Sequence, residues 1–556
     1  MPRFLKPTAY VLICLACFFL GAIVQTDDTP NPITREMVAS AEHLIGLTFT
    51  DVKRDSMLEG LRDQLNNYEG IRKVSLANSV SPAILFNPIP VGMTFETTRR
   101  PLQTSSPGRI TVPNSLDDLA FYSVGQLGEL IRTKRISSEQ LTRMYLSRLK
   151  KYGPKLECVI TLNEEGALRQ AKRADAEIAA GKYRGPLHGI PYGAKDLLAT
   201  KGIKTTWGSV PYKDQMIDED ATVIQRLEAA GAVLVAKLTM GELAWGDVWY
   251  GGKTRNPWNY EQGSSGSSAG SSSATAAGLV GFSIGTETWG SIVSPSTRCG
   301  TTGLRPTYGR VSRHGAMALS WSMDKIGPIC RTAEDCALVF AAIYGPDGKD
   351  QTLYDVPFNY TPVVNLSDLR IGYLKSDFDS VKEGKEFDDQ AFTVLKKLGA
   401  TLIPIELPHY PVNDLSIILT AEAGAAFDEL TRSGKDDLLV RQIKNAWPNV
   451  FRLSRFIPAI EYIQANRIRN LLIQDMATLM DDVDLYIAPP FQGDNLLLTN
   501  LTGHPCVVVP NGFTDKGTPT SITFMGRLFG EAQLLAVAKQ YQDATDFHLK
   551  HPALQE

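Results

Sequence analysis

The sequence has no long run of positive charge and no strong excess of either sign. It holds 57 Lys and Arg against 60 Asp and Glu over 556 residues, a formal net charge of -3. Proteins that bind nucleic acid through its phosphates usually carry a basic patch or stripe. The composition therefore argues against nucleic acid as a ligand. A hydrophobic fraction of 43% with 21% charged residues indicates a globular chain with a large core.

Cysteine is scarce and shows no pairing pattern. Seven cysteines are present, and two of them, Cys14 and Cys17, lie in an apolar N-terminal stretch. The other five form an odd set without C-x-x-C or Cys/His ligand spacing: Cys158, Cys299, Cys330, Cys336 and Cys506. We expect neither a disulfide framework nor a metal site, and interpret these five as buried, small apolar residues.

A hydrophobic run long enough for a comfortable membrane span, roughly 20 residues, is also missing. The apolar run from Tyr10 to Val24 is shorter, follows Arg3 and Lys6, and is closely followed by Asp27 and Asp28. This pattern is typical of a secretory leader. We predict that residues 1–26 are a signal peptide or membrane anchor and that the protein is exported: periplasmic, secreted or held at a membrane by its N-terminus. No clean A-x-A site follows, so cleavage stays open.

Histidine-based serine catalysis lacks its usual signals. The seven histidines stand in no recognisable triad order with a serine. The pattern G-x-S-x-G occurs twice, centred on Ser268 and Ser283, but a nucleophile elbow requires a strand-to-helix turn. The first match lies in a Gly/Ser tract and the second within an apolar strand, so neither is interpreted as an elbow.

Helical and strand patterns alternate along most of the chain. Apolar residues recur at three and four positions from 33 to 68, which predicts two amphipathic helices, and residues 80–113 are rich in proline without periodicity. Beyond them, helices opening at Ser123 and Ser138 (the latter stopping at Gly153-Pro154) alternate with apolar strands. We therefore predict an α/β fold with a large mixed, mostly parallel sheet covered by helices on both faces. The expected divisions are the leader, a helical accessory segment with its connection (27–115), and the main domain (116–556).

The Gly/Ser tract at residues 262–278 resembles a flexible linker by composition. It runs without a break into Leu279-Val280-Gly281-Phe282-Ser283-Ile284-Gly285, which is interpreted as a buried strand. Because a linker between domains would not lead straight into a core strand, we expect the tract to belong to the folded domain.

A lysine can replace histidine as the base if burial lowers its pKa from about 10.4 towards 7. Lys195 stands in GIPYGAKDLLAT, at the end of an apolar predicted strand where a solvated lysine is unexpected. Taken alone, a lysine beside Asp196 is more often a salt-bridged structural residue.

Three spaced segments change that weighting: GIPYGAKD, then SGSSAGS about 70 residues later, then GTETWGSIVSPS. Together with NPWN (256–259), CGTTGLRPTYGRVSRHG (299–315), DKIGP (324–328) and NLTGHPCVVVPNGF (500–513), they resemble the amidase-signature family. The resemblance extends from about Leu119 to the C-terminus. Its members include bacterial amidases, peptide amidases and the amidase subunit of glutamyl-tRNA(Gln) amidotransferase. The resemblance implies an amidohydrolase that forms a serine acyl-enzyme.

Residue by residue, the resemblance implies a Ser-Ser-Lys triad of Lys195 as base, Ser267 as bridge and Ser291 as nucleophile. It implies a cis peptide between Gly266 and Ser267. It also implies an oxyanion hole of main-chain N–H groups from Thr288, Trp289, Gly290 and Ser291, supported by Ser268 and Glu287. No cofactor or metal is expected.

Two positions depart from the family pattern, because Ser265 and Trp289 stand where glycine is usual. Trp289 leaves the substrate size open. A small-molecule or peptide amide is the expected substrate. Three alternatives stay open: a transferase resembling the tRNA-dependent amidotransferase, an inactive ligand-binding relative, and a homodimer instead of a monomer.

Overall fold

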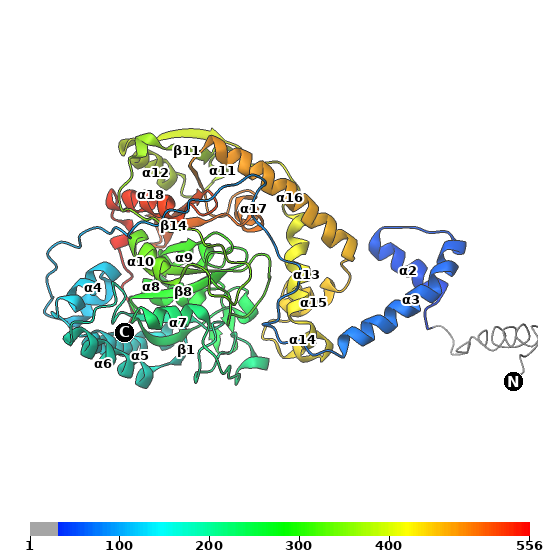
Figure 1. The fold of residues 1–556 in the computed structure, drawn as a ribbon, viewed down its shortest axis with the longest axis horizontal. Coiled ribbons are helices and arrows are strands. Elements are labelled where there is room, and N and C mark those ends of the chain that lie inside the picture. Colours follow the sequence, from blue (N-terminus) through cyan, green and yellow to red (C-terminus); the bar gives the residue numbers. More distant parts are fainter. Residues whose placement is uncertain (1–31, 556) are drawn as a thin grey trace, which may run out of the picture. The chain divides into compact units, whose positions relative to one another are not determined.

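The computed structural model describes residues 32–555, and its contacts divide the chain into two compact units, one ending at Leu76 and one starting at Ala77. The N-terminal unit contains two helices, α2 (Arg35–Ile45) and α3 (Asp51–Arg72), as the apolar periodicity predicts (Figure 1). Buried Glu42 joins them by accepting hydrogen bonds from Arg54 at 2.7 and 2.9 Å. The expected leader, residues 1–26, lies outside the described residues.

The proline-rich connection belongs to the larger unit, whereas the sequence pattern placed the boundary near residue 115. Asn78 donates to the Ala318 carbonyl at 2.9 Å, the Val91 N–H donates to Gln474 at 3.2 Å, and the Arg100 N–H donates to Asn359 at 2.8 Å. These partners lie 240 or more positions away in sequence. A segment without regular structure shows no periodicity that could have revealed them.

The larger unit is built on a sheet of 11 strands in the order β1-β3-β2-β8-β10-β9-β14-β15-β13-β11-β12. The strands are β1 (Val159–Leu162), β2 (Pro191–Lys195), β3 (Val233–Leu238), β8 (Phe282–Glu287), β9 (Thr302–Arg305), β10 (Lys325–Cys330), β11 (Arg370–Leu374), β12 (Thr401–Ile405), β13 (Leu485–Ala488), β14 (Cys506–Phe513) and β15 (Pro519–Gly526). Two small hairpins stand apart from it: β4 (Val248–Trp249) with β5 (Gly252–Lys253), and β6 (Arg255–Asn256) with β7 (Asn259–Gly263).

The sheet is mixed, as predicted, but the expectation that it is mostly parallel is wrong. Strand pairs β2–β3, β2–β8, β11–β12 and β11–β13 are parallel, and the remaining six pairs are antiparallel. The antiparallel pairs form the centre of the sheet, where strands from residues 282–330 and 485–526 meet. Alternation of helix and strand along the sequence predicts βαβ units, but it does not reveal which distant strands become neighbours.

Helices cover both faces of this sheet. Along β14, Val507 and Val509 pack in one apolar core while Cys506 and Val508 pack in another, so successive side chains enter opposite layers. Helix α10 packs on β10 and α18 on β14, while α8 packs on β8 and α9 on β14 (Figure 1). The helices are α4 (Val124–Arg132), α5 (Ser138–Leu156), α6 (Glu164–Ala179), α7 (Thr222–Ala229), α8 (Ala269–Ala276), α9 (Val293–Cys299), α10 (Ala333–Ile343), α11 (Lys375–Ser380), α12 (Lys385–Lys397), α13 (Ile417–Ala426), α14 (Asp428–Arg432), α15 (Trp447–Ser454), α16 (Ala459–Asp482), α17 (Asn495–Thr502) and α18 (Glu531–Asp543).

Local signals at helix ends were predicted within a few residues. Ser123 caps α4 in a capping box with Gln126, as expected. Helix α5 is capped by Ser137 instead of Ser138, and it continues through Gly153-Pro154 to Leu156. The fully buried Leu156 side chain packs in the core beneath this last turn, which explains why the helix outlasts its proline.

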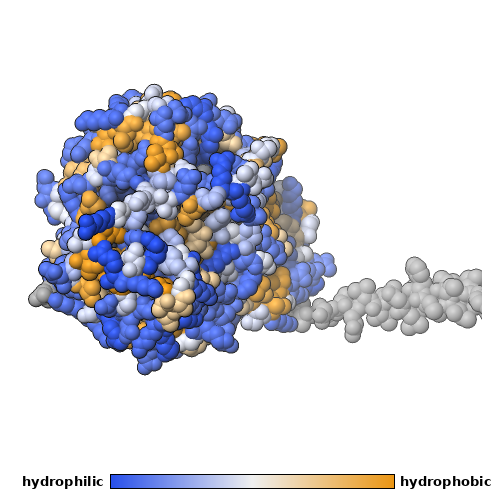
Figure 2. Space-filling view, turned by 60° about the vertical axis from the view of Figure 1, so that its left-hand side comes forward, coloured by the Kyte–Doolittle hydropathy of each residue, from blue (hydrophilic) through white to orange (hydrophobic). Residues whose placement is uncertain are grey.

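No helix among residues 32–555 is both long enough and apolar enough to cross a membrane. Hydrophilic residues cover most of the face shown in Figure 2, with smaller apolar areas between them. The five described cysteines are all free and buried, as the sequence predicts.

Candidate active site

Lys195 is the last residue of the buried strand β2, and its side chain is completely inaccessible to solvent. Its Nζ lies 2.8 Å from Ser267 Oγ, 2.8 Å from Thr286 Oγ1 and 3.1 Å from Ser268 Oγ. A longer contact of 3.4 Å reaches the Thr286 carbonyl. All four contacts are to neutral oxygens, and none of the ion pairs among the described residues includes Lys195.

This environment favours the neutral amine. Burial lowers the pKa of Lys195 to about 7, and the negative charges of Asp324 and Glu287, acting from a distance, only partly oppose that effect. A lysine with such a pKa is partly neutral near pH 7 and can accept a proton there.

Asp196 does not pair with Lys195. Its side chain points away from that lysine and accepts hydrogen bonds from the Thr206 N–H at 2.8 Å and the Thr206 hydroxyl at 2.6 Å. Lys237 Nζ lies 3.1 Å from Asp196 Oδ1 and 2.8 Å from Thr205 Oγ1. The salt-bridged structural role that a lysine next to Asp196 suggests therefore belongs to Lys237.

The Gly/Ser tract is part of the core. It ends in the helix α8, in which every residue is buried, and the tract thus forms folded structure as expected. The Gly266–Ser267 peptide just before it is cis. A Cβ at Gly266 would stand 1.8 Å from the Gly246 carbonyl oxygen, so only glycine fits this turn.

Ser268 fixes the strand that faces Lys195. Its hydroxyl donates to the Thr286 carbonyl at 3.0 Å and accepts from the Thr286 N–H at 3.1 Å. These bonds hold Thr286 beside the amine, and they occupy Ser268 in the supporting role that the family resemblance implies for it.

Ser291 lies in the loop between β8 and α9, and its side chain is largely buried. Its carbonyl accepts from the Ser268 N–H at 3.1 Å, which brings the loop against the Ser267–Ser268 segment. In the described part of the chain, no hydrogen bond joins the hydroxyls of Ser267 and Ser291. The N–H groups of Trp289, Gly290 and Ser291 are likewise engaged by no other described residue.

The backbone of this loop depends on glycine and on one carboxylate. Gly290 has φ +87°, a conformation that side chains rarely adopt. Trp289 is 42% exposed at the rim of the loop. Glu287, at the end of β8, accepts the N–H groups of Ile292 and Val293 at 2.8 and 2.9 Å.

Glu287 is itself held by two residues from distant parts of the chain. Arg305 donates to its Oε1 at 2.8 Å and Asn500 donates to the same oxygen at 2.9 Å. Burial alone would raise the pKa of Glu287, but the Arg305 guanidinium and these hydrogen bonds lower it to about 2. The carboxylate is therefore charged at any physiological pH.

Asp324 clamps the same loop from the opposite side. It accepts from the Thr288 hydroxyl at 2.6 Å and from the N–H groups of Leu319 and Ser320 at 2.8 and 3.0 Å. Burial raises the pKa of Asp324, and its hydrogen bonds counteract the rise. This residue thereby joins the loop before Ser291 to the segment at 315–322.

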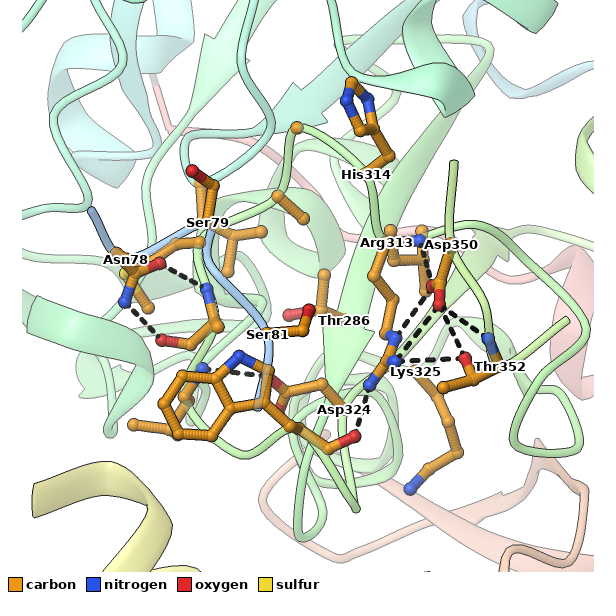
Figure 3. A pocket seen from close by; sticks show the side chains of 18 of the residues that line it. Asn78, Ser79, Ser81, Thr286, Arg313, His314, Asp324, Lys325, Asp350 and Thr352 are labelled. Atoms are coloured by element: carbon orange, nitrogen blue, oxygen red, sulfur yellow. Dashed lines mark hydrogen bonds and ion pairs between the residues drawn. The ribbon is translucent and has the colours of Figure 1, made fainter. Parts of the chain in front are cut away.

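A cavity of about 700 Å³ opens beside these residues. Thr286, Thr288 and Asp324 line its floor, and Figure 3 shows Asn78, Ser79 and Ser81 on one side with Arg313, Asp350 and Thr352 on the other. Cavities of this size accommodate small molecules. The volume, lined by both apolar and charged side chains, fits an amide substrate with a polar portion.

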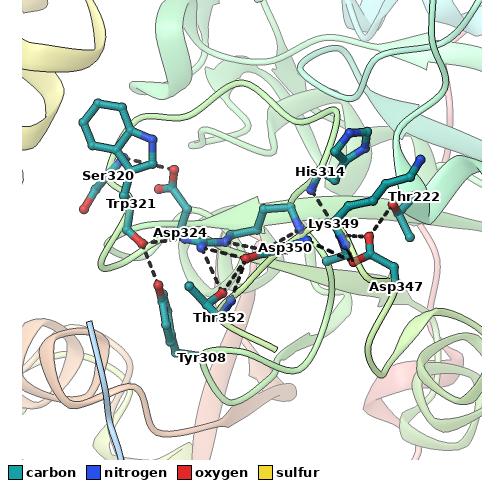
Figure 4. A network of polar contacts seen from close by, with 12 residues as sticks. Thr222, Tyr308, His314, Ser320, Trp321, Asp324, Asp347, Lys349, Asp350 and Thr352 are labelled. Carbon is teal, nitrogen blue, oxygen red and sulfur yellow. Dashed lines mark hydrogen bonds and ion pairs between the residues drawn. The ribbon is translucent and has the colours of Figure 1, made fainter. Parts of the chain in front are cut away.

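The far wall of the cavity is a rigid polar network (Figure 4). Arg313 donates to Asp350 at 3.0 Å, to Thr352 at 3.0 Å and to the Trp321 carbonyl at 2.6 Å. Burial would raise the pKa of Asp350, but the Arg313 guanidinium holds it at about 2. Because these groups satisfy one another, the wall keeps its shape without a ligand.

Several of these residues were missed from the sequence: Thr286, Arg305, Asp324, Arg313 and Asn500. The only available signal was a charged residue inside an apolar strand pattern, as for Arg305 in β9. A charge in such a place requires a buried partner, but the sequence does not say which.

Comparisons with known proteins agree with this geometry. The amidase family model matches residues 140–535. The chain is 36% identical over 480 residues to a glutamyl-tRNA(Gln) amidotransferase subunit from Marinomonas sp., covering 78% of this chain and 98% of the relative. The peptide amidase of Stenotrophomonas maltophilia is similar in structure, with a TM-score of 0.68, 30% identity and coverage of 77% of this chain and 97% of its own. The corresponding amidotransferase subunit from Thermotoga maritima gives 0.64, 26%, 78% and 96%.

The site and the match therefore lead to one assignment: this chain belongs to the amidase family and is an enzyme that acts on amide C–N bonds.

Proposed function

We propose that the protein hydrolyses a carboxylic amide to an acid plus ammonia or an amine, through an acyl-enzyme on Ser291, with Lys195 as base and Ser267 as the relay. The observation that carries this proposal is the surroundings of Lys195. A fully buried amine that contacts only hydroxyl and carbonyl oxygens, with a pKa of about 7, has no evident structural purpose. Perturbed groups of this kind cluster at catalytic sites.

In the first half-reaction, neutral Lys195 takes the Ser267 hydroxyl proton while Ser267 takes that of Ser291. Ser291 Oγ forms a bond to the amide carbon, and the carbonyl π electrons move onto oxygen. The relay then returns its proton to the amide nitrogen, the C–N bond breaks, and the amine leaves. In the second half-reaction, water repeats the attack on the ester and Ser291 is regenerated with the acid as product.

The developing oxyanion needs donors that are already oriented. The N–H groups of Trp289, Gly290 and Ser291 are suited to this because no acceptor among the described residues engages them, and Thr288 completes the proposed set. Glu287 supports them by binding the N–H groups of Ile292 and Val293 directly beyond the nucleophile. Asp324 supports them through Thr288.

Two alternatives use the same fold. A transferase like the amidotransferase subunits would deliver ammonia to an acceptor bound by partner subunits, whereas a hydrolase needs only water. The near-neutral charge argues against a nucleic acid ligand. An inactive relative would have lost a member of the triad, yet all three side chains are present.

We further propose that residues 1–26 direct export, because a basic start, an apolar run and two aspartates follow one another there. Expression of the full chain with fractionation of the cells tests this. N-terminal sequencing of the product distinguishes a cleaved leader from a retained anchor. Recovery of the intact chain in the cytosol would overturn the proposal.

Purified protein should hydrolyse simple amides by itself, and Ser291→Ala should reduce that rate by at least about a hundredfold, because triad members usually contribute several orders of magnitude. A fluorophosphonate should label the wild type and not Ser291→Ala. Ser283→Ala, at the second G-x-S-x-G motif, is the matched control and should still be labelled. Equal labelling of Ser291→Ala and the wild type would make another serine the nucleophile.

A further inference from the structure

One wall of the cavity comes from outside the region that matches the amidase family. Residues Ser79–Leu85, here called the strap, precede residue 140, where the family match begins. Ser79, Ser81, Pro82, Ala83, Ile84 and Leu85 all line the 700 Å³ cavity that Thr286 and Thr288 also line (Figure 3). The strap therefore adds to a family fold a wall that faces the proposed site of chemistry.

The strap is held mainly at one end. Asn78 donates to the carbonyls of Ala318 at 2.9 Å and Ala426 at 3.3 Å, and its Oδ1 accepts from the Ala318 N–H at 2.7 Å. Beyond this anchor, Val80 is 51% and Ile84 is 78% exposed, so little of the strap is buried in the core. Its position depends on the Asn78 side chain more than on apolar packing.

The strap also separates the cavity from a second space. A groove of about 1220 Å³ runs between it and α16, with Ile463, Ile468 and Leu471 along the helix side. Pro82, Ile84, Leu85 and Trp321 line both spaces. The strap and Trp321 are thus a shared partition, and removal of the strap would join the two spaces into one longer groove.

We propose that the strap is a specificity-determining element that restricts the enzyme to amides small enough to fit the 700 Å³ cavity. The proposal rests on the hydrolase function proposed above. With the strap in place, a substrate must fit between Thr286 and the far wall at Arg313. With the strap released, a bulky substrate can extend into the apolar groove along α16.

Two variants test this by different means. Asn78→Ala removes the anchor, and replacement of residues 79–85 by a Gly/Ser stretch of equal length removes the wall but keeps the chain length. Asn359→Ala is the matched control, because Asn359 likewise accepts from one backbone N–H (Arg100, 2.8 Å) and donates to one carbonyl (Thr98, 2.8 Å) in the same connection, but lines neither space.

The measurement is kcat/KM for a small aliphatic amide and for a bulky aryl-substituted peptide amide. We expect the ratio of bulky to small to rise by about tenfold or more in both strap variants, a size discrimination usual for enzyme pockets, and to stay within about twofold of wild type in Asn359→Ala. An unchanged ratio in both strap variants would overturn the proposal. So would an equal loss on both substrates, which would mean that the strap only supports the site.

Fluorophosphonates of two sizes separate this proposal from the function beneath it. If neither probe labels the wild type, the proposed nucleophile is wrong. If the small probe labels all variants, the bulky probe should label the strap variants faster than the wild type. Equal rates for the bulky probe in the wild type and both strap variants would remove the strap from substrate selection while leaving the hydrolase intact.

Discussion

Two fully buried lysines on neighbouring strands, Lys195 on β2 and Lys237 on β3, have opposite surroundings. Lys237 has a carboxylate, Asp196, at 3.1 Å, while Lys195 has only the hydroxyls of Ser267, Ser268 and Thr286 and one carbonyl. Burial lowers the pKa of both amines, and for Lys237 the charge of Asp196 opposes that effect at close range.

The difference teaches how a buried lysine can be interpreted. An amine with a carboxylate partner keeps its proton and contributes to stability, but its loss leaves an unpaired charge. An amine among hydroxyls can release its proton near neutral pH and serve as a base. The following predictions test this contrast.

Lys195→Met should reduce kcat by about a thousandfold or more at pH 7 while the protein stays folded, because a general base contributes up to about 10⁴. Initial rates with the small amide, and far-UV circular dichroism for the fold, check this. A rate within tenfold of the wild type would show that Lys195 is not the base.

Lys237→Met should instead lower the free energy of unfolding by about 3–5 kcal/mol, because it leaves Asp196 buried without a counter-ion. Urea denaturation measures this loss, and the folded enzyme should retain most of its activity. Adding Asp196→Asn should recover part of the stability. A double variant no more stable than Lys237→Met would contradict the ion-pair explanation.

The pH dependence should separate the two amines without mutation. Because the pKa of Lys195 is about 7 in the folded protein, kcat/KM should fall about tenfold per pH unit below pH 7 and level off above it, where the amine is neutral. Glu287, with a pKa of about 2, contributes no limb in this range. A profile that is flat from pH 5 to pH 9, with chemistry limiting the rate, would remove the assignment.

The smallest effect is expected at the rim. Trp289→Gly restores the residue usual for the family at a position that is 42% exposed. The fold should be unchanged, and kcat/KM for a bulky amide should rise by a few fold, up to about tenfold, while the small amide is nearly unaffected. A loss on both substrates would show that the indole contributes to the chemistry or to the loop.

Much of the fold followed from local patterns, because helix caps and strand runs depend on nearby residues. The N-cap at Ser123 and the strand ending at Lys195 are examples. The antiparallel centre of the sheet did not follow, because β9 pairs with β14 some 200 positions away, and no local pattern reports that choice. The end of α5 was missed for a related reason, since the buried contacts of Leu156 outweigh the preference of Pro154.

The site divides in the same way. The proximity of Lys195, Ser267 and Ser268 was predicted from three spaced motifs and the family resemblance. The supports that fix the loop, Asp324 and Asn500, carry no motif of their own that states a partner. Their roles arise from contacts across the fold, which sequence spacing does not encode.

The contacts of Glu287 have a consequence for when the enzyme becomes active during its synthesis. Its carboxylate oxygen binds Asn500, 213 positions later, in a hydrogen bond that fixes the loop beside the nucleophile. A ribosome delivers the chain from the N-terminus, at about 5–20 residues per second. The serine loop therefore leaves the ribosome at least about ten seconds before its last support does. A nascent or truncated chain that ends before α17 would carry all three triad side chains and yet lack the support that orients them.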